Sequence, residues 1–190
     1  IRGDRAIIMN NAIGGVELSS IAKGLEAADA MLKASEITLL VSRSVCPGKY
    51  IILVSGEVGA VNAAVAAGAA KAAHALIDNF VIPNIHPEVF PAIEGTAVVE
   101  ELEALGVIES FSVSALIEAA DAAVKAGSVK LIEVRLAMAL GGKAFVTMTG
   151  AVAAAETAVA AGAAVIAKKG LLVEKVVIPR PRKELLTEMI

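Results

Sequence analysis

The first half of the chain alternates between short runs of apolar, often β-branched residues and longer stretches in which apolar residues recur every three or four positions. The short runs predict four strands, at Ile13–Leu18, Ile37–Ser42, Lys49–Ser55 and Phe80–Ile82. Between them, one helix is expected after a capping Ser19 or Ser20, with an apolar stripe of Ile21, Leu25, Ala28 and Leu32. The Ala-rich stretch Val58–Ile77 predicts the second helix. This βαββαβ order is typical of a ferredoxin-like domain.

The second half repeats this pattern. It predicts strands at Leu105–Glu109, Val129–Arg135, Lys143–Thr149 and Leu172–Ile178, and helices at Ser114–Ala126 and Val152–Lys169. The residues repeat as well, because 12–35 aligns with 104–127 without a gap, and Glu-Ala-Ala-Asp-Ala stands at both 26–30 and 118–122. A repeat of this length indicates a duplicated domain and not a solenoid.

We therefore expect an α/β (α+β) chain with two tandem ferredoxin-like domains. Its predicted parts are an N-terminal flanking segment at 1–11, a first domain at 12–93, an acidic linker at 94–103 and a second domain at 104–190. Two similar domains in one chain suggest an assembly in which one domain type recurs around an axis.

Composition narrows the possible functions. Apolar residues make up 57% of the chain but aromatic residues only 3%, so the cores are expected to rely on close approach of Ala and Val side chains. The net charge of −3 offers no electrostatic footprint for nucleic acid. The most hydrophobic stretch, 151–167, is mostly Ala and contains Glu156, which argues against a membrane span. A single cysteine excludes an intrachain disulfide and fits a reducing cytosol.

The sequence contains no convincing catalytic residues, and we do not expect an enzyme. His74 falls within an Ala-rich helix and His86 between two prolines, and neither has a cysteine or second histidine at metal-ligand spacing. The pairs Gly48-Lys49 and Gly142-Lys143 do not form phosphate-binding loops, because the first glycine of that motif and the Ser or Thr after its lysine are missing. The duplicated Glu17 and Glu109 are expected to have a structural, hydrogen-bonding role.

The loops between the second and third strand of each half are the more informative places. They span 42–49 and 136–143, and both are rich in small residues that allow another chain or an axis to approach closely. The first loop contains Cys46, whereas the second has only Leu140 or Gly141 at the corresponding place. Cys46 stands in a Pro-Gly turn before Lys49, so we expect an exposed thiol whose thiolate form Lys49 favours.

Three groups of residues carry a resemblance to a known family. The segments 28–33, 56–61 and 177–181 resemble bacterial microcompartment (BMC) shell domains, and the resemblance covers 12–190 in both copies. The tandem form resembles trimeric shell proteins that mimic a hexamer. Within these, the segments 21–24, 45–49 and 85–87 are similar to the propanediol-utilisation type. The resemblance implies a structural protein in the microcompartment shell within the cytoplasm, tiling as flat pseudohexameric homotrimers beside other shell proteins.

The resemblance also implies a cofactor. Proteins of this type carry an iron–sulfur cluster on the trimer axis, held by one cysteine of each chain in this loop, which here is Cys46. Cubane clusters generally take four thiolates, so three chains would supply three of them and leave one iron for another ligand. A [4Fe–4S] cluster there implies electron transfer or cluster delivery across the shell, with an encapsulated or cytosolic redox enzyme as a possible partner. The other residues expected to line the opening are Val45, Pro47, Gly48, Lys49, Leu140, Gly141, Gly142 and Lys143.

Shell proteins of the family also use particular basic residues at the edge of the tile. The matching residues here are Lys33 and Lys125, each near the end of the first helix of its domain, and Arg180, where the first copy instead has Asn84. Two alternatives to the cluster-bearing tile stay open. One is the same trimer with Cys46 as a free thiol in a metabolite pore, and the other is a soluble ferredoxin-like regulatory module that binds a small ligand between its domains.

Overall fold

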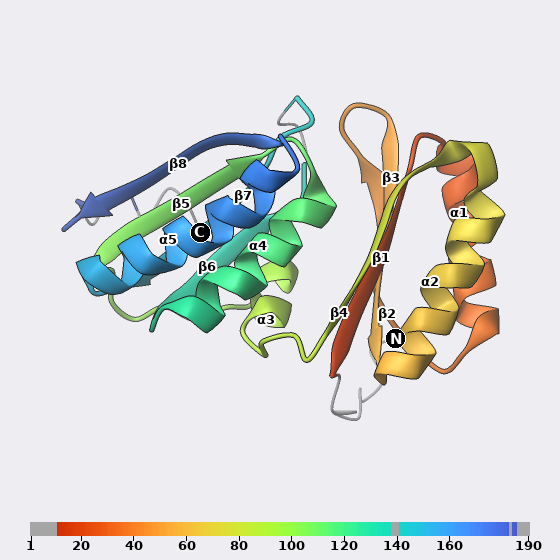
Figure 1. Ribbon diagram of the computed structural model, residues 1–190, viewed down its shortest axis with the longest axis horizontal. Coiled ribbons are helices and arrows are strands. Elements are labelled where there is room, and N and C mark those ends of the chain that lie inside the picture. The colour runs from red at the N-terminus through yellow and green to blue at the C-terminus, as the bar shows by residue number, and fades with distance from the viewer. Residues whose placement is uncertain (1–10, 138–140, 183, 186–190) are drawn as a thin grey trace. The chain divides into compact units, whose positions relative to one another are not determined.

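A computed structural model describes residues 11–137, 141–182 and 184–185 of the chain. The chain divides into two compact units, 1–85 and 86–190. Each unit contains a four-stranded sheet and two long helices, which are labelled in Figure 1. The α/β class and the predicted order of elements are therefore confirmed in both halves of the chain.

The first unit follows the βαββαβ order. Its elements are β1 (Ala12–Leu18), α1 (Ile21–Ala34), β2 (Thr38–Val45), β3 (Lys49–Gly56), α2 (Val58–Ala72), a 3-10 turn η1 (Ala73–Ala75) and β4 (Leu76–Pro83). The strands pair in the order β2-β3-β1-β4, with every neighbouring pair antiparallel. This is the strand order of a ferredoxin-like sheet, in which each helix returns the chain across one face.

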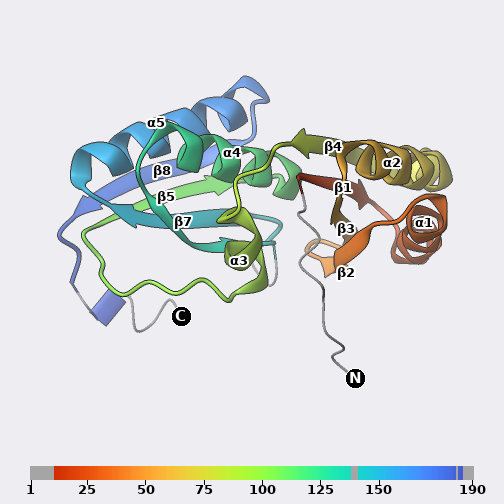
Figure 2. The same cartoon turned by 90° about the horizontal axis from the view of Figure 1, so that it is seen from below.

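The second unit adds one short helix before the same arrangement. Its elements are α3 (Val89–Glu94), β5 (Ala104–Ser110), α4 (Val113–Ala126), β6 (Lys130–Arg135), β7 (Ala144–Gly150), α5 (Val152–Lys168) and β8 (Leu172–Pro179). The strands pair antiparallel in the order β6-β7-β5-β8. Figure 2 shows α4 and α5 together on one face of this sheet.

The unit boundary lies before the predicted domain boundary at residue 93. Helix α3 packs on β6 and α4. The backbone N–H of His86 donates a hydrogen bond to Asp121 Oδ1 at 2.8 Å, and the backbone N–H of Leu131 donates one to Glu88 Oε2 at 3.0 Å. Residues 86–94, assigned from sequence mainly to the first domain, are thus held by the second.

Small residues allow the two long helices of each unit to approach closely. A Cβ added to Gly68 would lie 2.6 Å from Met31 Cγ, and one added to Gly162 would lie 2.7 Å from the carbonyl oxygen of Ala119. A side chain at Gly162 would therefore meet the backbone of α4, and one at Gly68 would displace the Met31 side chain from its place against α2. The duplicated glycines explain how a core so poor in aromatic residues can be close-packed.

The predicted apolar stripe of the first helix was wrong in detail. Ile21, Leu25 and Leu32 are exposed, and of the predicted stripe only Ala28 is buried. The buried face of α1 consists of Gly24, Ala27, Ala28 and Met31. Helical spacing identified the largest apolar residues. The inner face instead leaves room for larger partners, because a Cβ added to Gly24 would overlap the Tyr50 side chain of β3, and Met31 lies against Gly68 of α2.

The end of the second helix also differs from the prediction. Helix α2 ends at Ala72 and not at Ile77, and Ala73 adopts a positive φ of 48°. Strand β4 then begins at Leu76, which pairs with Leu18 of β1, with an irregularity in register next to that pair. Ala-rich sequence has high helix propensity throughout, so pairing with β1 decides where the strand begins.

Candidate functional site

The connection between β2 and β3 is a tight turn. Val45 still pairs with Lys49 across the two strands, so the loop predicted at 42–49 is reduced to Cys46, Pro47 and Gly48. Cys46 and Pro47 are joined by a cis peptide bond, and Gly48 has a φ of 71°. The Val45 side chain is buried, whereas Cys46 is half-buried and retains access to solvent.

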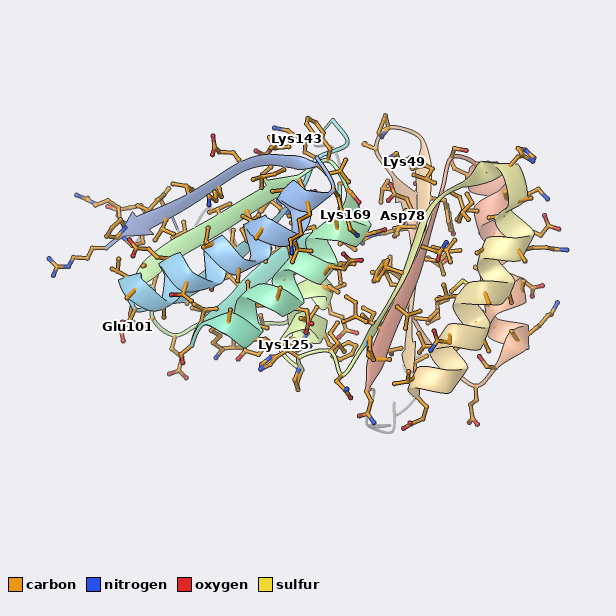
Figure 3. All side chains as sticks on the ribbon, viewed as in Figure 1. Lys49, Asp78, Glu101, Lys125, Lys143 and Lys169 are labelled. Carbon is orange, nitrogen blue, oxygen red and sulfur yellow. The ribbon has the colours of Figure 1, made fainter. Side chains whose placement is uncertain are left out.

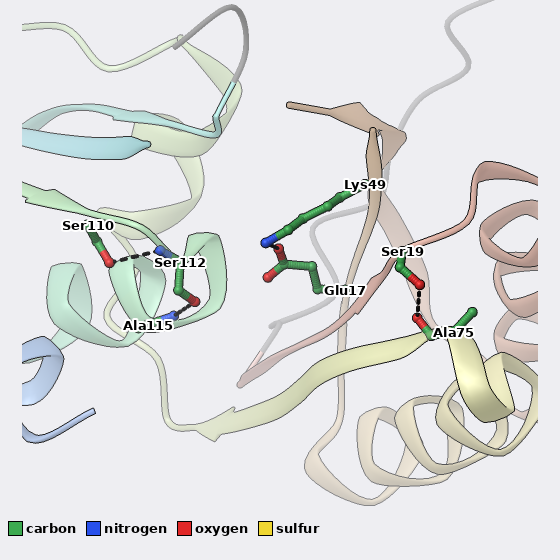
Figure 4. Close-up of polar contacts among 7 residues, drawn as sticks. All are labelled: Glu17, Ser19, Lys49, Ala75, Ser110, Ser112 and Ala115. Carbon is green, nitrogen blue, oxygen red and sulfur yellow. Dashed lines mark hydrogen bonds and ion pairs between the residues drawn. The ribbon is translucent and has the colours of Figure 1, made fainter. Parts of the chain in front are cut away.

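Lys49 is tied to the strand beside it. Its Nζ donates a hydrogen bond to Glu17 Oε1 at 2.8 Å, and the Glu17 side chain is only 3% exposed (Figure 4). A carboxylate so deeply buried requires a charged partner. The expectation that Lys49 serves the Cys46 thiol therefore needs correction, because its charge is matched to Glu17.

The same ion pair recurs in the second unit. Lys143 Nζ lies 2.6 Å from Glu109 Oε1, and there the side chains are 41% and 26% exposed. The structural role expected for Glu17 and Glu109 is confirmed, since each carboxylate anchors the lysine at the start of the returning strand. The sequence analysis named all four residues but did not predict the two ion pairs. The signal for them was that a glutamate and a lysine occur at corresponding places in both repeats.

The second loop is built differently from the first turn. Strand β6 ends at Arg135 and β7 begins at Ala144, which leaves a longer connection. Within it, Gly141 and Gly142 have φ values of 61° and 88°, and Leu140 lies outside the described residues. Arg135 lies over the Phe145 ring, with 5.5 Å between its Cζ and the ring centroid.

The three predicted edge residues are accessible. Lys33 lies 2.6 Å from Asp29 and Lys125 lies 2.6 Å from Asp121, each pair one helical turn apart. Figure 3 shows Lys125 near the end of α4 and Lys143 beside the loop between β6 and β7. Arg180 follows β8 with a φ of 48°, and Asn84, its equivalent after β4, has a φ of 51°. The backbone at the two positions is thus alike although the side chains differ.

Helix capping is also duplicated. Ser20 Oγ accepts a hydrogen bond from the backbone N–H of Lys23 at 3.3 Å, and Ser112 Oγ accepts one from Ala115 at 3.1 Å. In the second unit, Ser110 Oγ accepts a further bond from Ser112 N–H at 3.1 Å (Figure 4). These bonds satisfy amide groups of the first helical turn and fix the start of α1 and α4.

One chain cannot by itself hold a metal cluster at these positions. Within the described ranges, no group of three or more His, Cys, Asp or Glu side chains is arranged to hold a metal ion. Cys46 offers a single sulfur, and iron–sulfur clusters generally take several thiolates. A site at Cys46 therefore requires several copies of the chain.

The open face of the second sheet is hollowed. A pocket of about 370 Å³ lies over β5, β7 and β8 and is lined mainly by Leu105, Val107, Phe145, Thr147 and Val176. Its walls are mostly apolar, with Glu109, Glu174 and Lys175 also among the lining residues.

Among the helices that the structure describes, none has the length and apolar character needed to cross a membrane.

Comparisons with known proteins agree on one family. A family model described as "BMC domain" matches residues 12–85 and 104–181. The chain is 46% identical over 182 residues to the bacterial microcompartment shell protein PduT of Citrobacter freundii. The alignment covers 96% of this chain and 99% of that protein.

Solved structures show the same likeness. The crystal structure of a microcompartments protein from Desulfitobacterium hafniense matches 93% of this chain and 98% of its own, with a TM-score of 0.89 and 52% sequence identity. A fused permuted hexameric shell protein from the RMM microcompartment matches 82% of this chain and 81% of its own, with a TM-score of 0.61. At 23% identity, that second likeness concerns the fold alone.

Proposed function

This chain belongs to the BMC domain family, and from that premise we propose that three copies form a pseudohexameric shell tile with Cys46 at its axis. The chain is a structural shell protein of a bacterial microcompartment and not an enzyme, with its similarity to the PduT shell protein extending over nearly its full length. Two BMC domains per chain give six in a trimer, which is the arrangement that a duplicated domain favours.

The placement of Cys46 carries the proposal for the centre of the tile. It is the only cysteine, it is half-buried in a three-residue turn, and the second repeat has no thiol to match it. A Cβ built on Gly48 meets no heavy atom within 4 Å, so the turn is bordered by open space that other copies can enter. Three such turns around an axis bring together three sulfurs.

The donor set fits an iron–sulfur cluster. Cysteine thiolate is the ligand that such clusters use, and three chains supply three, which leaves one iron for water or another ligand. When bound, the cluster supplies a one-electron redox centre, suited to electron transfer or cluster delivery across the shell. The protein's own part is to hold the turn: the pairing of Val45 with Lys49, and the bond from Lys49 to Glu17, fix the two strands from which Cys46 projects.

Iron and sulfide analysis of anaerobically purified protein tests this proposal. Wild type is expected to carry about one cluster per trimer and a brown colour. Cys46→Ser should fold and trimerise normally, because the turn adds little to the core, but should lose iron and sulfide. Equal iron per trimer in reconstituted wild type and Cys46→Ser would overturn the cluster.

A second candidate is a metabolite pore without a cluster. Two observations favour it. Gly48, Gly141 and Gly142 have positive φ values, and a Cβ built on Gly48 or Gly141 would meet no heavy atom within 4 Å. Pro47, Gly48, Lys49, Gly141, Gly142 and Lys143 would line such an opening. Val45 contributes little in either case because its side chain is buried.

Other shell proteins are the partners that fit the tile, through Lys33, Lys125 and Arg180 at its edges. An encapsulated or cytosolic redox enzyme is the partner that a cluster at the axis would serve. The first proposal is supported by the family and by the exposure of Lys33 and Lys125, and the second depends on the cluster proposed above.

A further inference from the structure

The two repeats differ in what lies along one edge. In the second repeat, residues 86–94 run along β6, an edge strand, and contact α4. Two hydrogen bonds hold them: His86 N–H donates to Asp121 Oδ1 at 2.8 Å, and Leu131 N–H donates to Glu88 Oε2 at 3.0 Å. Asp121 and Leu131 are consequently buried.

At the equivalent edge of the first repeat, several of the described residues are exposed instead. Asp29, the equivalent of Asp121, has a side chain 62% exposed. Leu25 and Leu32 lie one turn before and about one turn after it on α1, and they are 58% and 46% exposed. Their equivalents on α4, Ile117 and Val124, are buried. Exposed apolar side chains gathered on one helix face, beside an unpaired strand edge, indicate an interaction surface.

The strand at this edge also matches its counterpart. Leu39 of β2 is the repeat equivalent of Leu131, and in both strands the pairing register becomes irregular directly after that residue. Leu39 is half-buried, whereas Leu131 is 1% exposed. Within the described residues, the first repeat therefore presents a similar edge whose apolar residues are more exposed than those of the second.

The chain contains a second copy of that segment. Pro83-Asn84 after β4 corresponds to Pro179-Arg180 after β8, with φ values of 51° at Asn84 and 48° at Arg180. At the same spacing, Glu184 corresponds to Glu88 and Leu185 to Val89. In sequence the correspondence continues to 190, where Leu186 and Met189 stand at the places of Phe90 and Ile93.

Two described residues of this second segment, Glu184 and Leu185, are exposed. Leu185 is 43% exposed, and the Glu184 side chain is 69% exposed and pairs with Arg182 at 2.7 Å. The hydrogen bond from Arg182 holds the pKa of the Glu184 carboxyl below its ordinary value, so the group is an ionised acceptor at neutral pH.

We propose that the segment beginning at Arg180 of one protomer lies along β2 and α1 of a second copy of this chain. In this arrangement Glu184 accepts a hydrogen bond from Leu39 N–H, Arg182 N–H donates to Asp29, and Leu185 packs beside β2, as Glu88, His86 and Val89 do within one chain. The proposal rests on the trimer proposed above and defines its interface.

Closure of the ring favours a second copy as the occupant. The segment that follows the first repeat covers the next repeat along the chain. The segment that follows the second repeat would, by the same rule, cover the first repeat of the next protomer. Three chains then match six segments to six edges, and a head-to-tail contact of this kind gives a closed ring when the rotation between protomers closes, as in the trimer proposed above.

Cross-linking between engineered cysteines tests the contact. The variant that reports the proposed contact carries Thr38→Cys and Glu184→Cys in a Cys46→Ser background. The purified variant is treated with a short bismaleimide. Lys130→Cys with Glu88→Cys is the matched control, since Lys130 is the repeat equivalent of Thr38 and lines the same pocket as Glu88. The first pair should give covalent dimers and trimers on a denaturing gel, and the control pair only single chains of altered mobility.

The outcomes separate this contact from the trimer itself. The protein could be trimeric by light scattering while the Thr38→Cys/Glu184→Cys pair links only within one chain, or not at all, and the control pair links. That result would overturn the contact and leave the trimer. Monomeric protein overturns both. As a second measurement, Leu185→Asp should weaken trimer association at least tenfold, whereas Val98→Asp, at a position 69% exposed and outside the proposed contact, should not. Equal association of the two variants would also overturn the contact.

Discussion

Helices α1 and α4 stand at the same place in the two repeats, share half of their residues and lie in different surroundings. Both are 14 residues long, both begin after a capping serine, and both contain Glu-Ala-Ala-Asp-Ala before a last-turn lysine. Yet four residues of α1 are buried against ten of α4. The identical residues include Ala27 and Ala28, which are buried in α1 as Ala119 and Ala120 are in α4. The clearest difference is that Leu25 and Leu32 are exposed where Ile117 and Val124 are buried.

The turns between the second and third strands show the same division. The ion pairs Lys49–Glu17 and Lys143–Glu109 are common to both repeats and anchor the strand that follows. The connection itself differs, with a three-residue turn containing Cys46 in one repeat and a longer, glycine-containing loop in the other. The two repeats thus share the fold and the ion pair, and they differ in this turn and in the burial of their first helix.

The largest expected effect tests the contrast between the two helices. Ile117→Ala should lower the free energy of unfolding by about 2–5 kcal/mol, because Ile117 is fully buried and its truncation leaves a cavity. Leu25→Ala, its repeat equivalent at 58% exposure, should change protomer stability by less than about 1 kcal/mol. Urea unfolding at low protein concentration measures both. Equal losses would contradict the contrast.

A smaller effect is expected at the two ion pairs. Lys49→Met should lower stability by about 1–3 kcal/mol, because it leaves the Glu17 carboxylate buried at 3% exposure without its charged partner. Lys143→Met should cost less than about 1 kcal/mol, since Glu109 is 26% exposed and water can solvate it. Thermal and urea unfolding compare the two variants. A larger loss at Lys143 would reverse the order that burial predicts.

The smallest free-energy change for a single contact is expected at the proposed tile edges. It becomes measurable there because the contact is repeated many times in an array. Lys33→Asp with Lys125→Asp should leave trimers intact but abolish sheets or shell incorporation, because weak edge contacts add up across an array. The control is Lys71→Asp with Lys168→Asp, which changes the same charge in the last turns of α2 and α5. Electron microscopy of the assemblies decides the matter, and normal tiling by the first double variant would show that these lysines are not edge residues.

Much of each domain could be predicted from the local sequence. Periodicity, capping serines and the internal repeat were sufficient for the βαββαβ order, because these signals reflect contacts inside one repeat. The same is true of the paired roles of Glu17 and Glu109, whose duplication pointed to a structural task. Cys46 was visible as a candidate ligand because it is the only thiol and stands in a turn.

Tertiary structure decided the rest. It placed Gly24, Ala27, Ala28 and Met31 on the inner face of α1, because Gly24 leaves room for the Tyr50 side chain and Gly68 of α2 leaves room for Met31. It assigned residues 86–94 to the second unit, through hydrogen bonds to Asp121 and Leu131 that no periodicity encodes. It paired Lys49 with Glu17, because a buried carboxylate requires a charged partner. Local pattern determines which elements form, and contacts between residues distant in sequence determine which of their faces remain free.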